Sequence, residues 1–295
     1  MNGKAAAIGT FDGVHLGHAA VLKLVRDIAD EKGFEPIAIT FDRHPLSLIA
    51  PQRAPAAITS IERKEKLIRR LGVTPVIVPF DETLRSTTAA EWMRLLRERY
   101  DVKALIVGYD NTFGSDGINY SISDYRSLGE RLGIEVIEAS VVDGVSSSAV
   151  RKNIEKGNVA EVKNMLGRPF SLSGIVVEGN KLGRTIGFPT ANILPSPGII
   201  IPGRGAYAAR VILPDGKKVD AMVNIGVRPT IRRGNESTIE AHLINWKGDL
   251  YGDRIRIEFY SRLRDEEQFK SIDALRKQLK LDLENTLTVL QPRQK

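Results

Sequence analysis

Gly9-Thr10-Phe11-Asp12-Gly13-Val14-His15-Leu16-Gly17-His18 is the stretch that decides how the first half of the chain folds. A short apolar run over 5–8 comes before it and predicts a buried strand. The apolar residues that follow recur with the spacing of one helix face. The stretch is therefore predicted to be a turn between a strand and a helix. Free backbone N–H groups and the positive end of the helix dipole favour a bound phosphate at such a turn.

Two glycines and two histidines give this turn its chemistry. Gly13 and Gly17 let the backbone approach a ligand closely. His15 and His18 lie three residues apart at the start of the helix, so both rings can face the same phosphate. The alternatives are a structural turn with two surface histidines, and a zinc site. A zinc site is disfavoured because no third His or Cys lies nearby and the chain has no Cys.

Length and composition are those of a globular protein with two domains. The chain has 295 residues, of which 42% are hydrophobic and 27% are charged. The absence of Cys excludes disulfides and thiolate metal sites and fits a reducing compartment. No stretch resembles a signal peptide or reaches the ~20 apolar residues of a membrane-spanning helix. We therefore expect a cytoplasmic protein that has no membrane partner.

The chain is basic, with a formal net charge of +7. A basic chain can bind nucleic acid, a membrane surface or acidic small molecules. Here the basic residues form scattered pairs, without a run of five or six and without an aromatic–basic RNA-binding motif. We therefore expect no nucleic-acid partner, and we interpret the excess charge as solvated surface together with phosphate ligands.

Strands and helices are predicted to alternate through the first half of the chain. The strands are expected over 5–8, 37–41, 76–78, 104–108 and 134–139. This order predicts an α/β fold with a parallel, doubly wound sheet. Ligands bind at the carboxyl ends of the strands in such sheets, and the turn at 9–18 is one of those ends.

Three further strand ends carry candidate residues: 41–45, 108–114 and 145–151. In the last of them, serines suited to cap a helix come about one turn before Arg151. The serine hydroxyls, the backbone N–H groups and Arg151 have the chemistry to bind a β- or γ-phosphate. The alternative is an ordinary helix cap with a solvated arginine.

The pattern changes near residue 153. A short helix over 159–166 is expected to close the first domain, and Gly167-Arg168-Pro169 to end it. Short strands then follow, over 173–178, 206–213, 217–225, 238–244 and 254–260. Their close spacing and a hairpin turn at Pro214-Asp215-Gly216 predict a small closed antiparallel β-barrel. We therefore place the domains at 1–155 and 170–295, joined by a linker helix within 156–169.

A C-terminal helix completes the second domain. Its apolar residues fall on one stripe: Phe269, Ile272, Leu275, Leu279, Leu283, Leu287 and Leu290. We expect this stripe to pack against the barrel, and pairing with a partner helix is the alternative.

The turn at 9–18 resembles an enzyme signature. His-x-Gly-His after a first strand resembles the nucleotidyltransferase signature, and the longer stretch resembles the bacterial bifunctional riboflavin kinase/FAD synthetase family. The resemblance implies a Rossmann-like domain in which His15 and His18 stabilise charge on the α-phosphate and pyrophosphate of ATP. The family's Ser-Ser-Thr-x-Ile-Arg segment matches here at Ser146, Ser147 and Arg151. ATP and phosphate contacts are thus implied for Gly9, Phe11, Asp12, Gly13, Gly17, Ser146, Ser147 and Arg151.

Two loops match this family with departures. The family's Phe-Asp-Pro-His-Pro loop is present, with Arg43 in place of the first Pro. Its Asp-Phe-Arg-Phe-Gly segment is also present, but Asn111 and Thr112 replace an aromatic residue and a cation. The resemblance implies that the flavin contacts of this domain come from Phe41, His44, Asp110 and Phe113.

A second signature lies in the C-terminal half. The stretch 183–192 is glycine-rich, lacks the Lys of a Walker A loop, and resembles the Gly-Arg-x-x-Gly-Phe-Pro-Thr-Ala-Asn signature of riboflavin kinases. The resemblance implies that Gly183 and Gly187 belong to a loop over the ATP phosphates. It also implies that Thr190 and Asn192 hold Mg²⁺, which prefers hard oxygen ligands of this kind.

Glu240 lies in a strand whose odd-numbered residues are apolar and are expected to face the core. A carboxylate on the other face is ordinarily a solvated strand residue. The resemblance implies instead that Glu240 is the base that takes the proton of the ribityl 5′-hydroxyl. Flavin contacts in this domain are implied for Asn224, Arg228, Tyr251 and Arg264.

The resulting hypothesis is an enzyme with two activities. It phosphorylates riboflavin to FMN with ATP and Mg²⁺, and then adenylylates FMN to FAD with release of pyrophosphate. One alternative is a riboflavin kinase whose first domain is degenerate, suggested by Arg43, Asn111 and Thr112. Another is a basic nucleic-acid-binding or regulatory protein built on the same barrel. The sequence does not give the oligomeric state.

Overall fold

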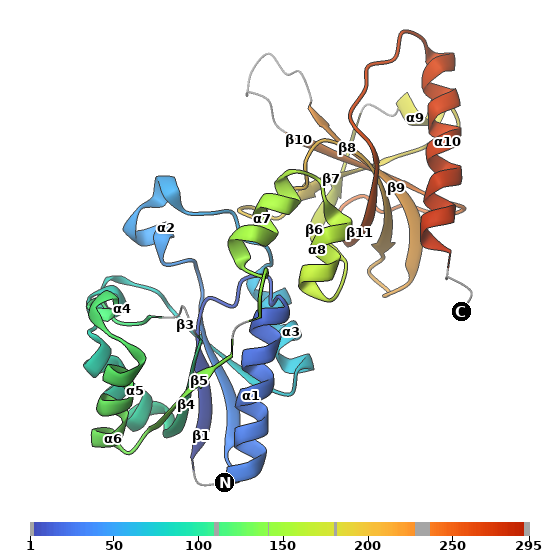
Figure 1. Ribbon diagram of the computed structural model, residues 1–295. Coiled ribbons are helices and arrows are strands. Elements are labelled where there is room, and N and C mark those ends of the chain that lie inside the picture. The colour runs from blue at the N-terminus through green and yellow to red at the C-terminus, as the bar shows by residue number, and fades with distance from the viewer. Residues whose placement is uncertain (1–2, 109–111, 141, 180–181, 228–236, 292–295) are drawn as a thin grey trace. The chain divides into compact units, whose positions relative to one another are not determined.

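The computed structural model describes residues 3–108, 112–140, 142–179, 182–227 and 237–291. The chain divides into two compact units, Met1–Ser147 and Ser148–Lys295 (Figure 1). The expected boundaries at 155 and 169 stay a prediction. No helix in the described ranges is long and apolar enough to cross a membrane.

Parallel strands form the sheet of the first unit, in the order β3-β2-β1-β4-β5. They are β1 (Lys4–Ile8), β2 (Glu35–Phe41), β3 (Thr74–Val78), β4 (Val102–Gly108) and β5 (Glu135–Ala139). Each begins and ends within two residues of its expected position, which confirms the doubly wound parallel sheet. The direction of strand addition reverses between β1 and β4, and ligands bind at the carboxyl ends beside such a reversal.

Helices cover both faces of this sheet (Figure 1). One face carries α1 (Leu16–Lys32) and α3 (Ile61–Arg70), and the other carries α5 (Ala89–Tyr100) and α6 (Ile122–Leu132). Because side chains alternate along a strand, those of β1 are divided between the two cores: Ala5 and Ala7 lie under α1, and Ala6 and Ile8 under α5. Shorter elements lie in the connections: α2 (Leu46–Ile49), η1 (Pro51–Arg53), α4 (Glu82–Ser86) and η2 (Gly117–Asn119).

The second unit contains the expected closed antiparallel barrel, with the strand order β10-β7-β6-β11-β8-β9. Its strands are β6 (Phe170–Val177), β7 (Ala191–Pro195), β8 (Gly205–Ile212), β9 (Lys218–Val227), β10 (Ser237–Leu243) and β11 (Arg254–Arg264). The sequence did not predict β7. This strand is short, ends on a proline and overlaps the glycine-rich signature, so it has no clear strand pattern of its own.

In the described ranges, the chain from Ser147 onward also forms helices α7 (Ser147–Glu155), α8 (Val159–Leu166), α9 (Leu182–Thr185) and α10 (Ile272–Leu290). The helix expected to close the first domain is α8, which ends at Gly167 in the left-handed conformation. It packs against β6 and β11. The structure therefore groups α8 with the barrel.

The stripe expected on the C-terminal helix is only partly correct. Leu279 and Leu283 of α10 pack against a small core on the barrel wall. Ile272 and Leu287 are instead exposed, whereas Asp282 on the same helix is buried. The barrel wall that α10 covers carries arginine side chains as well as apolar ones, so part of the buried helix surface is polar.

Candidate functional site

The first unit has a cavity of about 790 Å³ at the carboxyl edge of its sheet. Gly9 and Thr10 of the turn after β1 border it, and so do residues that follow β2, β3 and β4. Aromatic side chains form much of the wall: Phe41, Phe80, Trp92 and Phe113. Such a cavity suits a planar ring system. Of the flavin contacts expected in this unit, Phe41 and Phe113 lie in the wall.

The turn after β1 brings the two histidine rings together. His15 caps the N-terminus of α1, and its Nδ1 accepts the backbone N–H of His18 at 3.3 Å. The two rings stack with their centroids 3.6 Å apart. A Cβ at Gly17 would lie 3.1 Å from the His15 ring, so glycine leaves room for this stacking. Among the described residues, no group of three or more His, Cys, Asp or Glu could hold a metal ion.

Asp12 anchors this turn to the segment before α3. Its buried carboxylate accepts the backbone N–H groups of Ile58 and Thr59 at 3.0 and 3.1 Å. The neighbouring Gly13 N–H donates to the Thr59 hydroxyl at 3.2 Å, and Ser147 donates to the Asp12 carbonyl at 3.1 Å. These bonds point the carboxylate toward the segment before α3. The phosphate contact expected for Asp12 stays a prediction.

The loop after β2 is held by its own polar residues. Arg43 pairs with Asp42 at 3.2 Å. Partial burial favours the protonated carboxyl, but the Phe80 N–H and the Arg43 guanidinium outweigh it and hold the pKa of Asp42 below its ordinary value. His44 does not border the cavity. Its Nδ1 accepts the Leu46 N–H at 3.1 Å, at the start of α2.

The loop after β4 is described only in part. Asp110, expected to contact flavin, and Asn111 lie outside the described residues. Phe113 stacks on Tyr125 of α6 with ring centroids 4.4 Å apart. The Tyr125 hydroxyl also accepts the Phe113 N–H at 3.0 Å and donates to its carbonyl at 2.9 Å. The sequence did not indicate Tyr125 as a residue that supports this loop.

The expected triphosphate segment crosses the boundary between the two units. Ser146 and Ser147 end the first unit, and Ser147 begins α7. Arg151 lies on α7 in the second unit. The shared phosphate contact expected for these residues stays a prediction.

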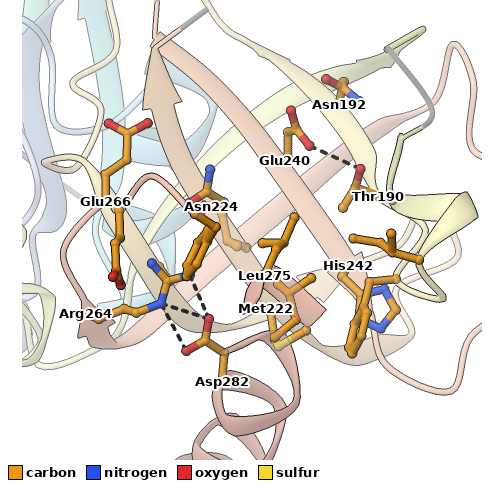
Figure 2. A pocket seen from close by; sticks show the side chains of 18 residues that line it. Thr190, Asn192, Met222, Asn224, Glu240, His242, Arg264, Glu266, Leu275 and Asp282 are labelled. Atoms are coloured by element: carbon orange, nitrogen blue, oxygen red, sulfur yellow. Dashed lines mark hydrogen bonds and ion pairs between the residues drawn. The ribbon is translucent and has the colours of Figure 1, made fainter. Parts of the chain in front are cut away.

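The second unit has a cavity of about 320 Å³ between the barrel wall and α10. Polar groups lie at both of its ends, with Met222 and Leu275 between them (Figure 2). Thr190, Asn192 and Glu240 form one polar end, and Arg264 and Asp282 form the other.

Glu240 lies in a row of polar residues that crosses three strands. In the strand register it is opposite Asn192 of β7 on one side and Asn224 of β9 on the other. Paired residues of neighbouring strands share a face of the sheet. The Thr190 hydroxyl donates to the Glu240 carboxylate at 3.2 Å (Figure 2). This places a carboxylate, a hydroxyl and two amides at one end of the cavity.

The residues at this end fit a hard divalent cation. Thr190 and Asn192 offer a hydroxyl and an amide oxygen, which are ligands of the kind that Mg²⁺ takes. The backbone at Gly179 comes so close to Asn192 that a Cβ there would lie 2.0 Å from the Asn192 amide. A side chain at position 179 would displace the Asn192 amide, so glycine lets the amide keep its position beside the cavity.

The glycine-rich turn shapes the same end of the cavity. Gly183 borders the cavity, and a Cβ there would lie 2.2 Å from the Phe188 carbonyl. Gly187 has a φ of 86°, a conformation that favours glycine. The turn places Phe188 against His242, whose Nδ1 lies 2.8 Å from the Pro189 carbonyl.

Arg264 and Asp282 form a buried ion pair at the far end. The Arg264 guanidinium donates to the carboxylate at 2.9 Å, and Gln278 of α10 donates to the same carboxylate at 2.9 Å. Asp282 is only 2% exposed. The sequence did not indicate it, because it lies within the run of leucines on α10. The one local signal for Asp282 is that it follows Gln278 by four residues, so both side chains lie on the same side of the helix.

One further flavin contact expected in this unit lies away from the cavity. Tyr251 does not border the cavity; it is 41% exposed and its hydroxyl accepts from Arg184 at 3.5 Å. Arg228 lies outside the described residues. Asn224 and Arg264 do border the cavity, as expected.

Comparison with known proteins gives both units a family. Residues 1–151 match the FAD synthetase family model, and residues 166–290 match the riboflavin kinase family model. The bifunctional riboflavin kinase/FMN adenylyltransferase of Escherichia coli K12 is 35% identical over 96% of this chain and 91% of its own length. The Bacillus subtilis protein of the same name is 33% identical over 95% of this chain and 90% of its own length.

One solved structure shares the whole fold. The crystal structure described as a macrolide-efflux protein from Streptococcus pneumoniae matches with a TM-score of 0.88 and 30% identity. The match covers 97% of this chain and 94% of that one.

Fold, cavities and matches together define a two-domain transferase that joins an FAD synthetase domain to a riboflavin kinase domain. More particularly, the chain belongs to the bifunctional riboflavin kinase/FMN adenylyltransferase family.

Proposed function

We propose that this chain converts riboflavin to FMN in its second unit and FMN to FAD in its first, using ATP in both steps. One observation carries the proposal. Each unit has a cavity of its own, and signature residues of that unit border it: Gly9 and Thr10 in the first, Gly183, Thr190 and Asn192 in the second.

In the kinase step, the ribityl 5′-oxygen attacks the γ-phosphorus of ATP and ADP leaves. Glu240 accepts the hydroxyl proton, which its place in the polar row at the cavity end supports. The Thr190 hydroxyl orients the carboxylate at 3.2 Å. Arg264, held by Asp282, binds the flavin at the other end of the cavity. Positioning and charge stabilisation supply most of the catalysis in such transfers.

Thr190 and Asn192 hold Mg²⁺ in this proposal, with Gly183 and Gly187 in the loop over the ATP phosphates. When bound, the ion neutralises charge on the phosphates of ATP. The hydroxyl and amide oxygens and the close approach at Gly179 support this assignment.

In the adenylyl-transfer step, a phosphate oxygen of FMN attacks the α-phosphorus of ATP. The bond from that phosphorus to the β-phosphate oxygen breaks, and pyrophosphate leaves. His15 and His18 stabilise the charge that develops, which their stacked rings at the start of α1 support. Ser146, Ser147 and Arg151 bind the triphosphate. Asp12 acts indirectly, by holding the turn in place.

The substrates of the proposal are riboflavin, FMN and ATP, and its compartment is the cytoplasm, which the absence of cysteine supports. We propose no nucleic-acid partner, since the basic residues are scattered along the chain.

A product assay tests the proposal. The full chain is incubated with riboflavin, excess ATP and Mg²⁺, and the flavins are separated by chromatography. We expect FMN to appear transiently and FAD to accumulate. His15→Ala should stop the reaction at FMN. Glu240→Gln should abolish phosphorylation of riboflavin, but this variant should still convert added FMN to FAD. FMN as the final product of the unmodified chain would indicate a degenerate first unit, and no flavin product would refute the proposal.

A further inference from the structure

Lys64 is a buried lysine beneath the carboxyl edge of the first unit's sheet. It lies on α3 in a highly charged segment, yet it is only 7% exposed. Its ammonium group donates to the Thr10 carbonyl at 3.1 Å, to the Thr40 hydroxyl at 2.9 Å and to the Phe41 carbonyl at 3.0 Å. All three N–H donors of a charged lysine therefore have an acceptor.

The acceptors belong to the turn after β1 and to the end of strand β2. Thr10 lies in the histidine turn after β1, and Phe41 ends β2; both residues line the cavity. The Thr40 hydroxyl donates in turn to the Thr10 carbonyl at 3.0 Å. One side chain from outside the sheet thus connects the turn that carries His15 to the wall that carries Phe41.

We propose that Lys64 is a positioning residue for adenylyl transfer, because its ammonium holds the Thr10 and Phe41 carbonyls at a fixed spacing. The inference rests on the proposed function of the first unit. Reacting groups lose rate steeply when their relative placement changes by about 1 Å. The Lys64 hydrogen bonds connect the turn after β1 to the cavity wall at Phe41. They therefore affect the relative placement of the two substrates, although Lys64 contacts neither.

The protonation of Lys64 gives the proposal a distinctive pH dependence. Burial lowers the pKa of Lys64 to about 8, against the opposing effect of three acids. Those acids are Asp12 in the turn, Asp42 after β2 and Glu65 on α3. A neutral amine has two N–H groups and cannot donate to all three acceptors. The rate of adenylyl transfer should therefore fall as the pH rises through about 8.

The test compares Lys64→Met with Lys66→Met in the full chain. Lys66 is exposed on the same helix and is the matched control. Conversion of FMN to FAD is measured across the pH range, and phosphorylation of riboflavin by the same sample serves as reference. We expect Lys64→Met to lower kcat for FAD formation by about 10-fold or more at neutral pH. In this variant, the decline in the rate of FAD formation above about pH 8 should also disappear. Riboflavin phosphorylation should be unchanged, and Lys66→Met should behave as the unmodified chain.

Thr40→Val provides a second variant if Lys64→Met fails to fold. It keeps the lysine but removes one acceptor, so the charged form is less stable and the alkaline decline should move to lower pH. An unmodified chain that makes no FAD from FMN would refute the proposed function and this inference together. An unmodified chain that makes FAD, with folded variants whose rates and pH profiles match it, would refute this inference alone.

Discussion

At the scale of single residues, the role of the Asp282 carboxylate can be tested by a substitution. It is buried with Arg264 at 2.9 Å, and removing one partner of a buried pair leaves an uncompensated charge, at a cost of about 3–5 kcal/mol. Asp282→Asn should therefore raise the KM for riboflavin strongly and lower the stability of the second unit. Conversion of FMN to FAD should be unchanged. Glu284→Gln, on the exposed side of the same helix, is the control. An unchanged KM would mean that Arg264 needs no orientation by Asp282.

Lys64 also links stability to pH. Its pKa of about 8 in the fold lies below the ordinary value of 10.5, so the unfolded chain binds more protons between these limits. The contribution of this group to the unfolding free energy therefore rises with pH in that window, by at most about 1.4 kcal/mol per pH unit.

To test this, the unfolding free energies of the Lys64 protein and of the Lys64→Met variant are measured by urea unfolding at about pH 8 and about pH 9.5. The chain has two tryptophans, Trp92 in the first unit and Trp246 in the second. A Trp246→Phe background lets fluorescence report the first unit alone. The stability of the lysine form relative to the methionine form should increase with pH. A difference that stays constant would contradict a lowered pKa.

Residue patterns predicted the site unevenly, for physical reasons. The histidines were singled out by their spacing in a turn, and Glu240 by a family resemblance, because both signals are local in the sequence. Lys64, Tyr125 and Asp282 were not found, because each acts through a partner far away in the sequence. From the sequence alone, Lys64 in its charged helix and Asp282 among leucines are both expected to be solvated. Only the fold shows the groups with which they pair.

At the level of elements, the start of α5 offers a clean test of capping. Thr88 caps the N-terminus of α5 and forms a capping box with Glu91. Thr88→Ala should lower the unfolding free energy of the first unit by about 1 kcal/mol. The hydroxyl of Thr87 bonds only to the Thr83 carbonyl, among the contacts described, so Thr87→Ala should cost less. Trp92, on α5 itself, reports both changes by fluorescence.

Element prediction succeeded where periodicity is strong and failed where a surface is mixed. The strands of the parallel sheet are buried on both faces and read as apolar runs. In contrast, β7 has no such run, and the buried side of α10 includes Asp282 and Thr286. Hydrophobic spacing cannot indicate a helix face that is buried against arginine.

For the whole molecule, the two units are expected to work as separate catalysts. Each has its own core and its own cavity. A mixture of His15→Ala and Glu240→Gln chains should therefore make FAD from riboflavin, although neither variant does so alone. FMN released by one chain is taken up by the other, so the rate should rise with protein concentration. A mixture that stops at FMN would show that released FMN does not reach the other chain.

The bonds of Asp12 bear on engineering. A designer who transplants the 9–18 turn onto another strand and helix would move its glycines and histidines. The turn would arrive without the two adjacent amide donors, at Ile58 and Thr59, that hold its acid. In a host that lacks these donors, the carboxylate would hydrogen-bond to other groups, and its negative charge would repel a phosphate bound nearby. The signature is thus not a self-contained module, and a functional graft has to include the docking segment before α3.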